Sequence, residues 1–252
     1  MPTFASFDGT TLAYHDDGEG APVVLLHGFA ADTNLNYVRS GVFDLLLDGG
    51  YRVIALDARG HGLSEKPHDA SAYADDAMRR DVQALLDELA LEHCVVVGYS
   101  MGAAVTLRLA MTDPRPTAVA LLGAGENMAD KEGGIERRTS MAEAFRVDDV
   151  DALPERVRAF REMADAIRAD REALGALLDA PWPDTATGLE QVTVPVIVIC
   201  GVDDDEVGSP EVLAAQLPNA EVVLVPGDHF TANARPELHA ALLEFLARVS
   251  AP

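Results

Sequence analysis

Residues 98 to 102 read G-Y-S-M-G, with glycines on both sides of Ser100. An apolar, strand-like VVV precedes this stretch and a helical pattern, AAVTLRLAM, follows it. A tight turn from strand to helix needs small residues, because the neighbouring backbone approaches closely, and it leaves the serine at the tip. The pattern predicts that Ser100 is a nucleophile at the N-terminus of a helix, where N–H groups stabilise negative charge.

A serine nucleophile requires a base, and His229 is the best placed of the seven histidines. It lies in the stretch PGDHF at the end of a predicted strand and follows an acidic run, Asp203 to Glu206. An acid in that run would orient His229 and complete a Ser-acid-His set. Neighbours in an extended segment face opposite ways, so only one of Asp203 and Asp204 can face His229. The residues alone leave that choice open.

Acyl chemistry also requires donors for an oxyanion. The stretch His27-Gly28-Phe29 follows the apolar run VVLL, at the end of another predicted strand. The backbone N–H of Phe29 is therefore expected to act with that of Met101 as the oxyanion hole. We interpret His27 as structural.

The elements that must position these residues alternate between strand and helix. A stripe of apolar residues at helical spacing occupies 78–89, and a second occupies 238–249. This alternation predicts an α/β fold: a mostly parallel central sheet of about eight strands flanked by helices, with an N-terminal hairpin turning at Gly9. The predicted strands are 3–8, 10–18, 23–28, 51–57, 93–99, 118–124, 194–201 and 220–227.

One interval, 126–187, contains helical patches at 154–167 and 171–178 but no strand-like run. We therefore expect a short helical cap inserted after the sixth strand. The domain boundaries predicted are 1–125 and 188–252 for the core and 126–187 for the cap. The cap holds eight of the 17 arginines, which pairing along helix faces explains.

The net charge of −23 opposes binding to nucleic acid or to an anionic membrane and favours a neutral or cationic substrate. The apolar runs are too short to span a membrane, and the first residues do not resemble a signal peptide. Cys94 and Cys200 fall in buried strands with no metal-binding spacing. These features predict a cytoplasmic monomer or small homo-oligomer that holds no metal.

Five motifs, in order along nearly the whole chain, resemble the α/β-hydrolase superfamily: LLHGF, DARGHGLS (57–64), GYSMG, PVIVICGVDD and PGDH. Within it the chain is similar to the small, capped bacterial esterase and haloperoxidase-like branch. The resemblance implies an acid in a G-x-x-D pattern from Gly201, which selects Asp204. In the loop 57–64 it implies structural roles for Asp57, Arg59 and His61.

The resemblance implies a serine esterase, with no cofactor, that cleaves small to medium and neutral esters through an acyl-enzyme on Ser100. Two alternatives remain open within the fold, namely hydrolysis of carbon–carbon bonds and of (enol-)lactones. A third belongs to a different class, a receptor for small ligands or a signalling protein that keeps the three site residues. Candidate pocket walls are Leu35, Tyr99, Phe145 and Trp182.

Overall fold

The computed structural model describes residues 1–129, 131–183 and 185–250, with 131–136 described by their backbone alone. The strands are β1 (Thr3–Ala5), β2 (Thr11–Asp17), β3 (Pro22–Leu26), β4 (Arg52–Leu56), β5 (Cys94–Tyr99), β6 (Pro116–Leu122), β7 (Val196–Gly201) and β8 (Ala220–Val225). The α-helices are α1 (Val42–Asp48), α2 (Ala77–Glu88), α3 (Met101–Thr112), α4 (Lys131–Arg146), α5 (Glu155–Ala166), α6 (Arg171–Asp179), α7 (Pro210–Ala214) and α8 (Pro236–Val249). Single helical turns are η1 (Asn34–Val38), η2 (Ala70–Tyr73), η3 (Glu126–Met128), η4 (Leu189–Gln191) and η5 (Ala232–Ala234).

The strands form one sheet of eight in the order β1-β2-β4-β3-β5-β6-β7-β8. β1 and β2 form the predicted N-terminal hairpin, and β2 runs antiparallel to β4. From β4 to β8 all pairs are parallel, which confirms the predicted α/β sheet. The carboxyl ends of the six parallel strands therefore meet at one edge, where ligands bind in sheets of this type.

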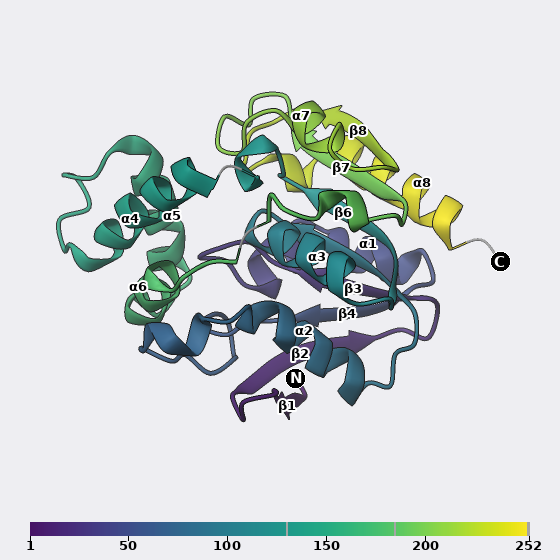
Figure 1. Cartoon of the computed structure of the whole chain (residues 1–252), viewed down its shortest axis with the longest axis horizontal. Coiled ribbons are helices and arrows are strands. Elements are labelled where there is room, and N and C mark those ends of the chain that lie inside the picture. Colours follow the sequence, from purple (N-terminus) through teal and green to yellow (C-terminus); the bar gives the residue numbers. More distant parts are fainter. Residues whose placement is uncertain (130, 184, 251–252) are drawn as a thin grey trace.

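Both faces of the sheet are buried, because successive side chains along each strand point to opposite sides. Val24 and Val96 face a core shared with α2, α3 and α7. Val23 and Val97 face a second core shared with α1 and α8. The result is a three-layer arrangement with the sheet between two layers of helices (Figure 1). Across the described residues, no helix has the length and apolar character needed to cross a membrane.

Helices α4, α5 and α6 lie between β6 and β7 in the chain, after the sixth strand as predicted, and stand to one side of the sheet (Figure 1). Residues 130 and 184 of this interval, and 251–252 of the predicted core, lie outside the described residues. The helices share a third apolar cluster in which Phe145 and Leu174 pack with Met101 and Tyr73. Met101 begins α3, so these helices cover the edge of the sheet where the parallel strands end.

Candidate active site

Ser100 occupies a sharp turn between β5 and α3. Its backbone has φ 52° and ψ −112°, in a region that residues with a side chain seldom adopt. A Cβ added at Gly102 would lie 2.0 Å from the carbonyl oxygen of Leu26, and one at Gly98 would lie 2.3 Å from the carbonyl oxygen of Gly102. Both glycines are thus required by close backbone contact. The turn fixes the seryl hydroxyl at the edge of the sheet.

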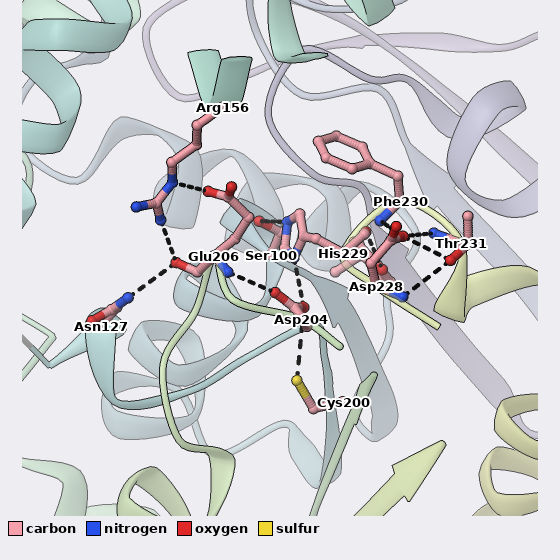
Figure 2. Close-up of polar contacts among 11 residues, drawn as sticks. Ser100, Asn127, Arg156, Cys200, Asp204, Glu206, Asp228, His229, Phe230 and Thr231 are labelled. Atoms are coloured by element: carbon pink, nitrogen blue, oxygen red, sulfur yellow. Dashed lines mark hydrogen bonds and ion pairs between the residues drawn. The ribbon is translucent and has the colours of Figure 1, made fainter. Parts of the chain in front are cut away.

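His229 joins Ser100 to the acidic run through both ring nitrogens (Figure 2). Its Nε2 lies 3.0 Å from Ser100 Oγ, and its Nδ1 lies 2.8 Å from Oδ2 of Asp204. A carboxylate only accepts, so Nδ1–H donates to Asp204 and Nε2 is left to accept the seryl proton. The three side chains therefore form one directed chain of hydrogen bonds from serine to carboxylate.

The carboxylate that reaches His229 is that of Asp204, whose side chain is fully buried. Its Oδ1 accepts the N–H of Glu206 at 3.0 Å. Asp203 is exposed, and its backbone N–H donates to the carbonyl of Gly227. The sequence alone left open which aspartate faces His229. The turn after β7 decides it, because it directs Asp204 inward and Asp203 outward.

A thiol that the sequence did not single out also contacts the acid. Cys200 Sγ lies 3.7 Å from Oδ2 of Asp204 (Figure 2). Burial, together with the neighbouring Asp204 carboxylate, raises the pKa of the Cys200 thiol to about 12. The thiol stays protonated at neutral pH and is available as a weak donor to the same oxygen that accepts from His229.

Two further contacts hold the loop that carries His229. The hydroxyl of Tyr99 donates to the carbonyl oxygen of His229 at 2.7 Å. On the other side, Oδ1 of Asp228 accepts the N–H groups of Phe230 and Thr231 at 3.0 and 2.9 Å. The G-x-S-x-G pattern placed Tyr99 next to Ser100 but gave no signal for its contact with this loop. These bonds fix the height of the imidazole above Ser100.

The loop after β3 presents the N–H of Phe29 to the site. The two amides on either side are occupied: Gly28 N–H donates to Oδ1 of Asn36 at 2.7 Å, and Ala30 N–H donates to Nε2 of His61 at 3.2 Å. Among the described residues, no acceptor contacts the N–H of Phe29 or that of Met101, the first residue of α3. Two backbone donors near Ser100 are therefore open to a ligand.

The loop 57–64 supports the loop after β3 through hydrogen bonds. Arg59 is fully buried and forms a bidentate ion pair with Asp81, with both nitrogen–oxygen distances at 2.6 Å.

Nδ1 of His61 lies 3.0 Å from the carbonyl of Arg59. Burial, with a smaller effect from neighbouring His27, lowers the pKa of His61 to about 3. His61 is thus neutral, with Nε2 free to accept from Ala30. His27 likewise bonds to backbone, accepting from the N–H of Ala58 at 3.0 Å.

Ser100 lies at the junction of two cavities. One, of about 310 Å³, extends beneath α4 and is lined by Met101, Met141 and Trp182 among others. The second, of about 270 Å³, is lined by Leu35, Tyr99 and His229 among others. Phe29 and Phe160 border both.

Three of the four expected pocket residues therefore line a cavity next to Ser100, and Phe145 does not. Phe145 is buried in the cluster beneath the cap, with its ring 5.4 Å from that of Phe29. It supports the wall from behind instead of forming it. Phe160, which no sequence pattern marked, forms the shared wall of both cavities.

The chain matches the family model described as the alpha/beta hydrolase fold over residues 21–142. It is 30% identical to a Synechocystis sp. protein provisionally named a non-heme chloroperoxidase, over 93% of this chain and 94% of that protein.

Solved structures give the same result at the level of the fold. A thermophilic esterase from Thermogutta terrifontis, described as malate bound, is 26% identical over 99% of each chain with a TM-score of 0.77. An esterase from Exiguobacterium antarcticum has a TM-score of 0.81 over 97% of this chain and 98% of its own, at 22% identity, a likeness of fold alone.

Proposed function

Since the chain belongs to the α/β-hydrolase superfamily, in its esterase and haloperoxidase-like branch, we propose that it is a serine hydrolase of carboxylic esters of small to medium size. The observation that carries the proposal is the directed hydrogen-bond chain from Ser100 through His229 to Asp204. This hydrogen-bond chain begins at a serine that borders two cavities, beside two unoccupied backbone donors. These features support acyl transfer through a serine nucleophile.

In the proposed reaction, Ser100 Oγ attacks the ester carbonyl carbon while Nε2 of His229 accepts the hydroxyl proton. The Phe29 and Met101 N–H groups hold the resulting oxyanion. His229 then gives its proton to the departing alcohol oxygen, which leaves an acyl-enzyme on Ser100. A water molecule repeats the sequence, with its proton going to His229 and then to Ser100 Oγ as the acid is released. Asp204 stabilises the charged imidazole in both halves.

Each of the two cavities is proposed to bind one part of the ester. The group that protonates the leaving alcohol must lie beside it, and His229 lines the 270 Å³ cavity. We therefore assign that cavity to the alcohol part. The 310 Å³ cavity, which Met101 and the cap residues line, takes the acyl part.

The test is steady-state hydrolysis of 4-nitrophenyl butyrate by the native protein and by Ser100→Ala. We expect many turnovers per molecule, and a loss on the order of 10⁴ or more in kcat for the variant. Ser140→Ala is the matched control, because Ser140 is an exposed serine on α4. A single turnover per molecule would favour a receptor for small ligands.

A panel of esters of graded acyl length, lactones and vinylogous diketones then tests the bond that is cleaved. Faster turnover of lactones or diketones than of every open-chain ester would refute the ester assignment while keeping the hydrolase.

A further inference from the structure

One position on the inward face of α4 carries a charge where its neighbours on that face are apolar. Arg138, Met141, Ala142 and Phe145 follow the spacing i, i+3, i+4 and i+7, which places them on one face. Ala142 and Phe145 are buried on that face, and Met141 packs against the same cluster. Arg138 therefore lies on the inward side of the helix and lines the 310 Å³ cavity together with Ser100.

Arg138 differs in its contacts from four of the other cap arginines. Arg146, Arg156, Arg161 and Arg171 each form an ion pair with a carboxylate, although only the pair of Arg161 lies along one helix as predicted. Among the residues whose side chains the structure describes, none places a carboxylate within ion-pair distance of Arg138. Its guanidinium Cζ lies 5.9 Å from the centroid of the Trp182 ring. That ring is held by its own hydrogen bond, from Nε1 to the carbonyl of Leu177 at 3.2 Å.

Among the described residues that line the cavity, two are arginines and one is a carboxylate. Arg137 also lines it and donates to the carbonyl of Asn127 at 2.9 Å. Glu206 supplies the one carboxylate among the described lining residues, and Arg156 pairs with it at 2.6 Å (Figure 2). Burial, with the charge of Arg137, lowers the pKa of Arg138. An anion in the cavity would relieve this repulsion and replace lost hydration.

We propose that the acyl cavity binds a carboxylate at Arg138, so that the substrate is a half-ester of a small dicarboxylic acid. This inference rests on the proposed function and on the assignment of the 310 Å³ cavity to the acyl part. It replaces the neutral substrate expected from the net charge with an anionic one. The field of the whole molecule is screened beyond about 8–10 Å at physiological salt, whereas a guanidinium in the wall acts at contact. A carboxylate also matches its planar fork of donors.

The substrate pair that tests the proposal is mono-4-nitrophenyl adipate and 4-nitrophenyl hexanoate, which share chain length and leaving group and differ in the terminal carboxylate. We expect the native protein to favour the half-ester in kcat/KM. Arg138→Gln should lower that value for the half-ester by about 10- to 100-fold, the range for a hydrogen-bonded charge, and change the hexanoate rate by less than about 3-fold. Retained hexanoate hydrolysis shows that the variant is folded.

Arg171→Gln is the matched control, because it removes a cap charge that lines neither cavity at Ser100. It should leave both rates unchanged, and Arg138→Lys should recover part of the half-ester rate. An equal loss on both substrates in Arg138→Gln, or a native protein without preference for the half-ester, would overturn the proposal.

Binding of free adipate, measured by calorimetry against neutral hexanamide, separates this proposal from the proposed function. If no ester is turned over but adipate binds and Arg138→Gln weakens that binding at least 10-fold, the hydrolase assignment fails and the anion site stands. If esters are hydrolysed but adipate binds no better than hexanamide, the anion site fails and the hydrolase stands.

Discussion

The four consecutive acidic residues after β7 have separate environments. Asp204 is buried against His229, Glu206 pairs with Arg156, and Asp203 and Asp205 are exposed. Mutual repulsion is thereby limited, because the two inward carboxylates each have a partner and the other two remain in water. The four carboxylates are adjacent in the sequence, but the fold directs them into different environments.

Replacement of each aspartate by asparagine tests which carboxylate orients the imidazole. Asp204→Asn should lower kcat on the order of 10⁴, because the amide permits the wrong tautomer of His229. Asp203→Asn and Asp205→Asn serve as controls and should change kcat by less than about 3-fold, since exposed charges contribute little. The measurement is kcat for 4-nitrophenyl butyrate. A large loss in Asp203→Asn with little in Asp204→Asn would contradict the arrangement described here.

At the scale of elements, the turn that carries Ser100 depends on how closely β3 and α3 approach. The Cβ of an alanine at Gly102 would meet the backbone oxygens of Leu26 and His27 at 2.0 and 2.8 Å. Backbone atoms cannot rotate away as a side chain can. The glycine is therefore a condition for packing α3 against the sheet at this distance.

Gly102→Ala should consequently destabilise the protein by about 3 kcal/mol or more, through forced separation of β3 and α3. Gly175→Ala in α6 is the opposite case, because an added Cβ there has no neighbour within 4 Å. That variant should gain about 0.5–1 kcal/mol from higher helix propensity. Urea unfolding monitored by circular dichroism measures both. Equal effects of the two substitutions would show that contact at Gly102 is not the cause.

Elements with a regular period were predictable from the sequence. The apolar runs gave all eight strands to within a few residues, and the stripes at 78–89 and 238–249 became α2 and α8. The short helices α1 and α7, and α4 in the cap, were not anticipated. The first two are too short for a periodic signal, and the only strong stripe of α4 is interrupted by Arg138.

Contacts between elements were harder to predict, because no local pattern encodes them. Whether Asp203 or Asp204 faces His229 depends on the conformation of one turn. The sequence selected Asp204 only through its resemblance to a known family. The error at Phe145 has a related cause. An aromatic residue on an apolar stripe is equally suited to a core and to a cavity wall, and only the packing of α4 against Phe29 decides between them.

At the scale of the whole molecule, the net charge of −23 is a source of self-repulsion in the compact state. Many surface carboxylates are paired, such as Asp16 with Arg52 at 2.7 Å, but 42 acidic residues face only 19 basic ones. Folding brings the excess charges together. The stability of the protein should therefore depend on ionic strength more than that of a neutral chain.

We expect the melting temperature to rise by about 5 °C between about 0.02 and 0.5 M NaCl, the shift that ~2 kcal/mol produces in a chain of this length. Calorimetry at constant pH measures it, and KCl at equal concentration should give the same rise because screening does not distinguish the two cations. A flat or falling melting temperature would mean that surface ion pairs, which salt weakens, outweigh the repulsion.

The neutral state of His61 has a consequence for how activity responds to acid. Because its pKa lies at about 3, the ring continues to accept the Ala30 N–H throughout mildly acidic conditions. The loop bearing the Phe29 amide therefore keeps its shape while the medium is acidified. Any loss of activity in mild acid should therefore come without displacement of this loop, which an unchanged amide chemical shift of Ala30 would show.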